Sequence, residues 1–393
     1  MVGEMISSTA SSFAAIAGGI GGALVLMGVI ILVCFCMFHY KRYSNRNSDT
    51  ASSDPSAAVE QKTGGPVSSL ALAQGGVPEG ARVFRMQELE QATKNFDQSN
   101  LIGCGSFGLV FKGFLFDGTI VAIKTRSAAP RQQFSEEVAR LSMTQHRNLV
   151  NLLGYCQEGG YQILVLEYLP NGTMCNHLYG MGRDSSTKLE FKQRLSIASG
   201  TAKGLCHLHG QCPPVVHGNF KTGNVLVDEN FIAKVADAGI SRLLKEINHD
   251  AAGPSHSIQA SPFIDPEVNQ SGVVSEASDI YGFGVFLWEL ITGREAAHIS
   301  GLGSNQTMHQ WVEAHLSSDD LVDHRLMGKY SAEGMRDLIR VAMRCTSFPG
   351  KERPNMDMVA IEAERILEKE IMGSTAMGEA SATLTLGSQL FTN

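Results

Sequence analysis

Three closely spaced glycines constrain the fold of this 393-residue chain more than any other feature. Gly103, Gly105 and Gly108 form a G-x-G-x-x-G pattern, which is typical of loops that contact phosphate groups. A dinucleotide-binding fold requires a helix directly after this pattern, whereas residues 109–111 (LVF) predict a strand. An Asp117-Gly118 turn then precedes another predicted strand. The glycines are therefore predicted to lie in a β-hairpin, which argues against a dinucleotide-binding fold.

The strand after this turn ends with two residues that suit a nucleotide. Ala122 and Lys124 are two positions apart, so their side chains share one face of the strand. A small side chain leaves room for a flat ring, and an ammonium group beside it can contact phosphates. Backbone amides of the glycine-rich loop can close over the same phosphates, because glycine carries no side chain. The segment therefore predicts a nucleotide site.

Further motifs follow in a fixed order along the chain. G-x-G-x-x-G-x-V followed by V-A-I-K opens the protein-kinase signature. The later segments are FSEEVARLSMTQHRNLVNLLGYC, LVLEYLPNGT, VVHGNFKTGNVLV, KVADAGISRLL and SDIYGFGVFLWELITG. Between residues 84 and 371 the chain resembles the plant receptor-like kinase family. The resemblance implies an α+β, two-lobed protein-kinase fold with a small β-rich N-lobe and a helical C-lobe.

The same resemblance implies a site for ATP and Mg²⁺. Lys124 is expected to pair with Glu137, although an exposed helix carboxylate is the alternative for Glu137. Asn224 and Asp237 are expected to bind the metal. Lys221 is expected to orient the γ-phosphate, with a solvated surface lysine as the alternative. The residues expected to contact ATP are Ile102, Gly103, Gly105, Gly108, Val110, Ala122, Lys124, Glu137 and Leu226.

The catalytic loop departs from the family pattern at two positions that matter for phosphoryl transfer. Where the pattern is His-Arg-Asp-Leu-x-x-x-Asn, this chain has His217, Gly218, Asn219 and finally Asn224. Gly218 thus replaces the arginine that would bind a phosphate on the activation segment. Asn219 replaces the aspartate that accepts the proton of the substrate hydroxyl, and a neutral amide cannot accept it. General-base assistance is worth roughly 10²–10⁴-fold in rate, so slow or absent turnover is expected.

Later departures point in the same direction. The Asp-Phe-Gly of the magnesium loop is Asp237-Ala238-Gly239, which keeps the metal ligand and loses the aromatic ring. Truncating a buried Phe to Ala costs ~3–5 kcal/mol unless neighbours fill the space, so this loop is expected to be loosely held. The threonine that docks the substrate hydroxyl aligns with Ala260, and Pro262 replaces a glycine. The chain is therefore expected to be a family member with a degenerate catalytic loop.

A long uncharged segment precedes the kinase-like region. No Asp, Glu, Lys or Arg occurs between Glu4 and Lys41, and residues 14–38 are a run of 25 apolar and small side chains. A helix of that length exceeds the ~30 Å hydrocarbon core of a bilayer. Lys41, Arg42 and Arg46 follow the run, so the positive-inside rule places the N-terminus outside and the remainder in the cytosol. A single-pass anchor in the plasma membrane is predicted, and no base precedes the run as a signal peptide requires.

The predicted organisation has five parts. They are a short extracellular N-terminus (1–13), a transmembrane helix (14–38), a disordered juxtamembrane linker (39–81), a kinase-like domain (82–371) and a flexible C-terminal tail (372–393). The linker is rich in small and polar residues, so it has little apolar surface to bury. Ala14, Gly18 and Gly22 have the spacing that allows two transmembrane helices to pair, although small residues also occupy unpaired spans.

Composition and motifs together leave three interpretations of function. A net charge of −7 disfavours a nucleic-acid-binding protein. The leading interpretation is a pseudokinase that binds ATP and Mg²⁺ and acts as a cytosolic scaffold or allosteric partner. Its partners would be other membrane receptor kinases or cytosolic signalling proteins. The alternatives are a weakly active Ser/Thr protein kinase and a membrane adaptor that does not bind nucleotide.

Overall fold

The computed structural model describes residues 81–179, 189–248, 261–299, 311–312, 315 and 321–389. The predicted extracellular N-terminus, the transmembrane helix and nearly all of the linker lie outside these residues, and so does Ala260. Among the described residues, no helix combines the length and the apolar character needed to cross a membrane. The anchor at 14–38 therefore stays a prediction.

The described strands and helices follow the order expected for a β-rich lobe and then a helical lobe. The strands are β1 (Arg82–Val83), β2 (Leu101–Cys104), β3 (Leu109–Phe114), β4 (Ile120–Ser127), β5 (Leu152–Cys156), β6 (Tyr161–Glu167), β7 (Val225–Val227) and β8 (Ala233–Val235). The helices are α2 (Met86–Thr93), α3 (Gln132–Met143), α4 (Met174–Tyr179), α5 (Phe191–His209), α6 (Ile240–Asn248), α7 (Pro266–Ser271), α8 (Glu276–Thr292), α9 (Ala296–Ile299), α11 (Ala332–Cys345) and α12 (Met356–Gln389).

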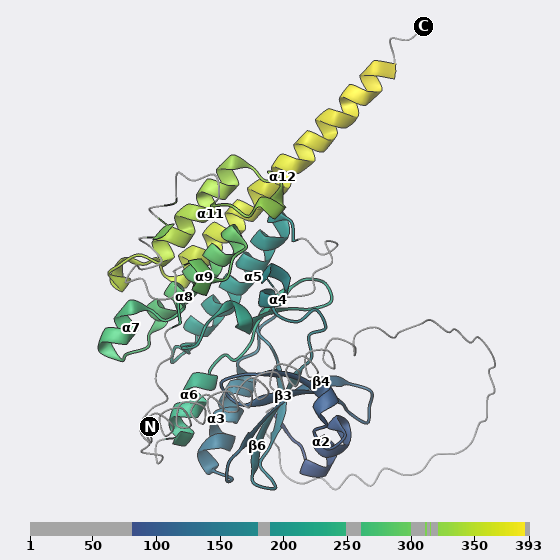
Figure 1. The fold of residues 1–393 in the computed structure, drawn as a ribbon, viewed down its shortest axis with the longest axis vertical. Coiled ribbons are helices and arrows are strands. Elements are labelled where there is room, and N and C mark those ends of the chain that lie inside the picture. The colour runs from purple at the N-terminus through teal and green to yellow at the C-terminus, as the bar shows by residue number, and fades with distance from the viewer. Residues whose placement is uncertain are drawn as a thin grey trace, which may run out of the picture. The chain divides into compact units, whose positions relative to one another are not determined.

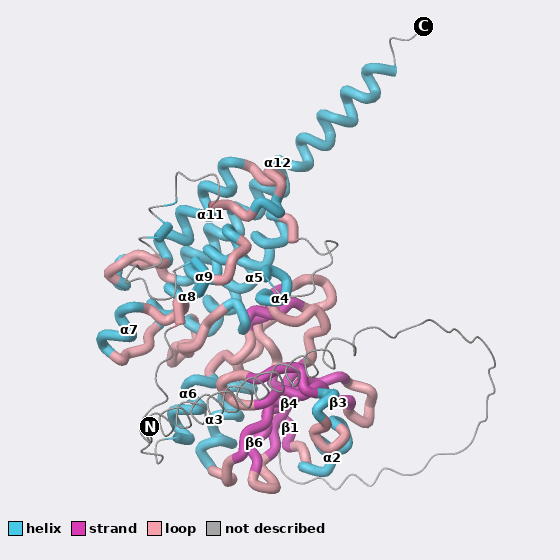
Figure 2. The backbone as a smooth tube through the Cα atoms, viewed as in Figure 1, coloured by secondary structure: helices cyan, strands magenta, loops and turns pink. Residues whose placement is uncertain are grey.

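Strands β1 to β6 form one twisted sheet in the N-terminal lobe (Figure 1 and Figure 2). Their order is β1-β5-β6-β4-β3-β2, with β1 parallel to β5 and the other pairs antiparallel. Val121 and Ile123 of β4 are fully buried, whereas Ala122 and Lys124 alternate with them on the opposite face. The hairpin strands predicted around the glycines are confirmed.

Helices α2 and α3 pack on this sheet through apolar side chains. Leu89 of α2 is buried in one cluster with Ile123 of β4. Phe134 of α3 is buried in a second cluster with Leu164 of β6. Each helix therefore has one buried face. The cluster around Phe134 also contains Ile240 and Leu243 of α6, so the position of α3 depends on α6 as well.

Helices α5, α8, α11 and α12 form most of the larger, helical lobe (Figure 1). Helix α5 packs along α12, and α8 packs along α11. A Cβ at Gly284 of α8 would lie 2.8 Å from Cys345 Cβ of α11, so a glycine is needed where these two helices approach each other. Trp288, Phe283 and Phe286 of α8 are fully buried. The two-lobed kinase fold predicted from the sequence is confirmed.

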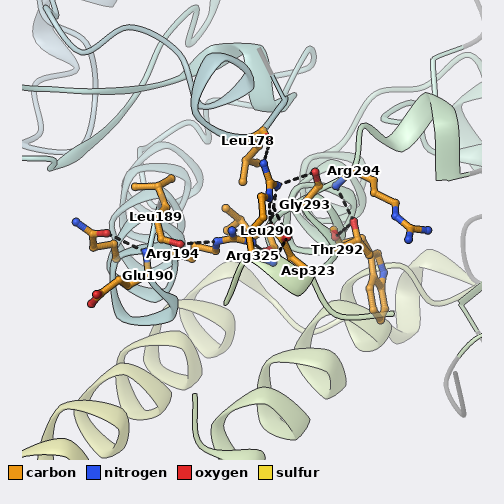
Figure 3. A network of polar contacts seen from close by, with 12 residues as sticks. Leu178, Leu189, Glu190, Arg194, Leu290, Thr292, Gly293, Arg294, Asp323 and Arg325 are labelled. Atoms are coloured by element: carbon orange, nitrogen blue, oxygen red, sulfur yellow. Dashed lines mark hydrogen bonds and ion pairs between the residues drawn. The ribbon is translucent and has the colours of Figure 1, made fainter. Parts of the chain in front are cut away.

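A buried network of charges holds the helical lobe together near the end of α8 (Figure 3). Arg194 of α5 donates to an Asp323 carboxylate oxygen at 2.6 Å and to the Leu290 backbone oxygen at 2.7 Å. Arg325 donates to the same carboxylate at 2.8 Å and to the Gly293 backbone oxygen at 3.0 Å. Burial raises the pKa of Asp323, but hydrogen bonds from Arg325 and the charge of Arg194 outweigh it and hold this pKa at about 2. Each buried charge thus has a partner, as low-dielectric surroundings require.

Helix α12 continues past the predicted end of the kinase-like domain at residue 371. Its backbone is helical as far as Gln389, so most of the predicted tail is helical rather than extended. The flexibility expected of this tail stays a prediction.

Candidate nucleotide-binding site

A cleft of about 270 Å³ lies between the glycine-rich strands β2 and β3 and the segment after β6 that joins the two lobes. The predicted site residues that line it are Ile102, Gly103, Gly105, Val110, Ala122, Lys124, Asn224, Leu226 and Asp237. Gly108, Glu137, Asn219 and Lys221 are not among the lining residues. The cleft therefore collects most of the predicted residues, and the role of each stays a prediction.

The register of β3 against β4 positions the N-lobe part of the site. Val110 of β3 lies opposite Lys124 of β4. Gly108, just before β3, has φ +149°, and a Cβ there would lie 2.0 Å from the Thr125 backbone oxygen. Only glycine allows the two backbones to approach this closely, so Gly108 shapes the cleft without lining it.

One buried carboxylate holds the catalytic loop. Asp279 of α8 accepts hydrogen bonds from the backbone N–H of His217 at 2.7 Å and of Gly218 at 2.8 Å. The Asn224 side chain donates to the Asn219 backbone oxygen at 2.9 Å. These bonds use the backbone of the loop, so they do not depend on whether residue 219 is an acid or an amide.

The side chain of Asn219 faces the glycine-rich loop. It is half-buried, and its amide nitrogen lies 3.5 Å from Ser106 Oγ, which is a weak hydrogen bond. An amide offers both a donor and an acceptor but has no site that takes up a proton at neutral pH. Lys221, two residues later, is exposed. The loop can therefore orient a hydroxyl group, but residue 219 cannot act as its base.

The expected ion pair between Lys124 and Glu137 is absent, and this expectation was wrong for the conformation described. Lys124 instead pairs with Asp237. Glu137 Oε2 lies 2.5 Å from an Arg140 guanidinium nitrogen, and its Oε1 lies 3.4 Å from Arg242 Nε. The physical reason is that α6 brings Arg242 to the carboxylate, so Glu137 has two cationic neighbours, Arg140 and Arg242.

The residues at the end of the cleft fit a magnesium–nucleotide complex. Asp237 and Asn224 both line the cleft, and a Cβ at Gly105 would lie 3.9 Å from Asp237 Oδ2, so the glycine-rich loop reaches over this carboxylate. Among the described residues, no group of three or more His, Cys, Asp or Glu side chains could hold a metal by itself. Such a sparse donor set suits Mg²⁺, which is usually held by one or two carboxylates together with substrate phosphates. When bound, Mg²⁺ neutralises phosphate charge.

The missing aromatic ring of the magnesium loop leaves only a small hollow. A cavity of about 40 Å³ is lined by Ala238, by Leu141 of α3 and by Ile240 of α6, among others. A Cβ at Gly239 would lie 2.3 Å from Leu141 Cδ2, so α3 packs directly onto the loop. Side chains of α3 and α6 thus occupy part of the space. The loose hold expected for this loop stays a prediction.

Several residues of the site were not singled out from the sequence. Glu167, Tyr168, Leu169 and Pro170 line the cleft, and their signal was the LVLEYLPNGT segment itself. Arg242 had no local signal, because its contact with α3 depends on the folding of α6.

Comparisons with known proteins agree with this architecture. The profile described as protein tyrosine and serine/threonine kinase matches residues 96–362. Proline-rich receptor-like protein kinase PERK2 of Arabidopsis thaliana is 36% identical over 321 residues, which are 79% of this chain and 43% of that protein. Proline-rich receptor-like protein kinase PERK15 of the same plant is 34% identical over 354 residues, 86% of this chain and 68% of that protein. The solved pseudokinase domain of BIR2, an immune regulator of the RLK/Pelle family, has 30% identity and a TM-score of 0.61, covering 72% of this chain and 86% of that one.

The fold, the cleft and these matches define the class: the chain belongs to the protein tyrosine and serine/threonine kinase family. It spans less than half the length of PERK2, so the activity and partners of the whole relative do not transfer to it. Within the family it is a plant receptor-like kinase homologue, as the motifs predicted, and its catalytic loop carries Gly218 and Asn219 in place of arginine and aspartate.

Proposed function

We propose that this chain is a membrane-anchored receptor-like pseudokinase that binds Mg·ATP and signals by contact with other proteins. One observation carries the proposal, namely that the residues expected to hold Mg·ATP lie together while the residue expected to accept the proton is replaced. Lys124, Asn224 and Asp237 meet at one cleft, whereas the position of the catalytic base holds Asn219. The chain therefore keeps the groups expected to hold a nucleotide and lacks the group that accepts the proton.

The comparison with BIR2 supports the same proposal. The similar solved domain is described as the pseudokinase domain of an immune regulator. A chain that shares its fold and lacks the catalytic carboxylate is suited to regulate another kinase through surface contacts. The partners proposed are other membrane receptor kinases or cytosolic signalling proteins.

Thermal unfolding of the purified full chain in detergent tests nucleotide binding. A ligand that binds only the folded state stabilises it by ~2.7 kcal/mol at 100 times Kd. In a domain of this size we expect Tm to rise by ~5–10 °C with Mg·ATP. Lys124→Met should reduce the shift. Lys112→Met is the matched control, because Lys112 lies on the neighbouring strand and does not line the cleft.

Incorporation of labelled phosphate, measured on the same samples, separates the three candidate functions. A Tm shift without incorporation supports the pseudokinase. Incorporation that Lys124→Met abolishes identifies a weakly active kinase instead. No shift at millimolar nucleotide contradicts nucleotide binding and favours the membrane adaptor.

The membrane anchor is proposed from residues 14–38 and the basic residues after them. A tag placed after Asn393 should be digested by protease in sealed microsomes without permeabilisation, because the C-terminus is expected in the cytosol. A tag that is protected until detergent is added would show the opposite orientation.

A further inference from the structure

The hairpin that joins β3 to β4 carries three large apolar side chains that are open to solvent. Phe114 of β3 lies opposite Ile120 of β4, and the two residues are 50% and 40% exposed. Phe116, in the turn between the strands, is fully exposed. Single exposed apolar residues are ordinary on protein surfaces, whereas a group of them at one place indicates an interaction site. We call Phe114, Phe116 and Ile120 the hairpin tip.

The turn holds Phe116 in a fixed position. The backbone N–H of Leu115 donates to the Thr119 backbone oxygen, and the N–H of Gly118 donates to the Leu115 backbone oxygen, both at 2.9 Å. Gly118 has φ +86°, which glycine adopts without strain. The Leu115 side chain is buried in the N-lobe. Because hydrogen bonds and packing already order the turn, covering Phe116 costs little conformational freedom.

Polar groups flank the apolar side chains of the hairpin tip. Lys112 Nζ lies 5.2 Å from the centroid of the Phe114 ring and 4.7 Å from that of Tyr168. Asp117 Oδ1 accepts a hydrogen bond from the Thr119 backbone N–H at 2.9 Å, which holds the carboxylate in the turn. Such an amphipathic tip suits the boundary between lipid headgroups and acyl chains, where apolar side chains are covered and polar groups stay hydrated.

The hairpin lies beside the start of the described chain. Phe84, directly after β1, is buried in the same cluster as Leu115, and the next element, α2, contacts β3 (Figure 1). The predicted membrane span ends at residue 38, so roughly 40 residues separate it from β1, and a flexible linker of that length has an r.m.s. span of ~35 Å. The bilayer is therefore within reach of the hairpin tip, and the tether raises its local concentration.

The size and shape of the hairpin tip also favour a bilayer over a protein partner. Two phenylalanines and one isoleucine, exposed to this extent, present an apolar area on the order of 400 Å². A stable protein interface buries about 800 Å² on each partner. A narrow turn can instead enter the ~5–10 Å of the headgroup boundary in which interfacial segments are buried.

We infer that the hairpin tip inserts into the membrane to which the chain is anchored and holds the N-lobe against the bilayer. Phe114, Phe116 and Ile120 enter the headgroup boundary, and Lys112 remains at the lipid phosphates. This inference rests on the proposed function, because the anchor at residues 14–38 supplies the bilayer. A second copy of the chain is the competing occupant.

Tryptophan fluorescence of the full chain in phosphatidylcholine nanodiscs tests the insertion. The test variant is Phe116→Trp. Tyr161→Trp is the matched control, because Tyr161 is 41% exposed and pairs with Ser127, at the opposite end of β4 from Ile120, on the same lobe and the same linker. Emission of the unmodified chain, which has two tryptophans of its own, is subtracted. Lipids with brominated acyl chains should quench about half of the added emission of Phe116→Trp and less than about one-tenth of that of Tyr161→Trp.

A photoactivatable phosphatidylcholine in the same discs probes the chain without a new tryptophan. Mass spectrometry should locate lipid adducts on residues 14–38 and on residues 114–120. In the double variant Phe114→Ser, Phe116→Ser, the adducts on 114–120 should fall by about five-fold or more, whereas those on 14–38 should persist.

Equal quenching of Phe116→Trp and Tyr161→Trp, or adducts on residues 14–38 with none on 114–120, would overturn the inference and leave the anchor in place. A blue shift of Phe116→Trp that grows with protein concentration and is not quenched by brominated lipid would identify a second copy as the occupant instead. If residues 14–38 acquire no adducts, the proposed anchor fails, and quenching of Phe116→Trp still decides whether the hairpin tip contacts lipid.

Discussion

The partner of Lys124 leads to the most decisive prediction about this site. The Lys124 side chain is 13% exposed and that of Asp237 is 6% exposed, so the pair is largely removed from water. Glu137 is occupied by Arg140 and Arg242. The variant Asp237→Asn should therefore leave the Lys124 ammonium group without a counter-charge.

The cost follows from the position of the pair at the wall of the cleft. Breaking a fully buried ion pair costs ~3–5 kcal/mol, and an exposed pair contributes ~0–1 kcal/mol. The asparagine retains an acceptor for Lys124, and water enters the cleft, so we expect a loss of about 2 kcal/mol. In a domain of this size such a loss lowers Tm by ~4–8 °C.

A double-mutant cycle in the absence of nucleotide measures the interaction itself. The four proteins are the unmodified chain, Asp237→Asn, Lys124→Met and the double variant, each unfolded with urea. The coupling free energy should be about 1–2 kcal/mol, because Lys124→Met removes the charge that Asp237→Asn exposes. The parallel cycle with Glu137→Gln should give less than about 0.5 kcal/mol, since Glu137 pairs with Arg140 and Arg242 rather than with Lys124.

The reverse result would refute the reasoning. If Lys124 couples strongly to Glu137 and weakly to Asp237, then the resting protein holds α3 against the cleft. In that case the assignment of Asp237 as the partner of Lys124 fails.

Three further predictions concern catalysis and stability. Asn219→Asp alone should raise phosphate incorporation less than about ten-fold, well below the ~10²–10⁴ of a general base, because Lys124 still pairs with Asp237. Asp323→Ala should cost ~3–5 kcal/mol in urea unfolding, because Arg194 is left as a buried charge. The pKa of Asp323 is held at about 2, below its unfolded value of ~3.9. Its contribution to the free energy of unfolding is therefore present above pH ~4 and is lost as pH falls toward 2. Asp323→Ala should not show that loss. Burial raises the pKa of Glu289 to about 7, so stability should fall as pH rises from ~4.3 through 7, and Glu289→Gln should remove this fall in unfolding measurements at pH 5 and 8.

Sequence reasoning was successful where the determinants are local. The glycine pattern is followed at once by a strand, and Ala122 and Lys124 share a face because side chains alternate, so the hairpin and one wall of the cleft could be predicted. The place of Glu137 could not be predicted in the same way. It depends on α6, a short helix whose position is set by tertiary contacts of Ile240 and Leu243 rather than by spacing.

The replaced positions of the catalytic machinery differ in their physical consequences. Asn219 changes chemistry alone, because the loop around it is held by backbone hydrogen bonds to Asp279. Gly218 and Ala238 change packing, because larger side chains there would meet α6 or α3. A carboxylate restored at residue 219 therefore faces a cleft in which Lys124 still neutralises Asp237. We expect a carboxylate at residue 219 alone to restore little phosphoryl transfer, because Asp237 must also be free to bind Mg²⁺.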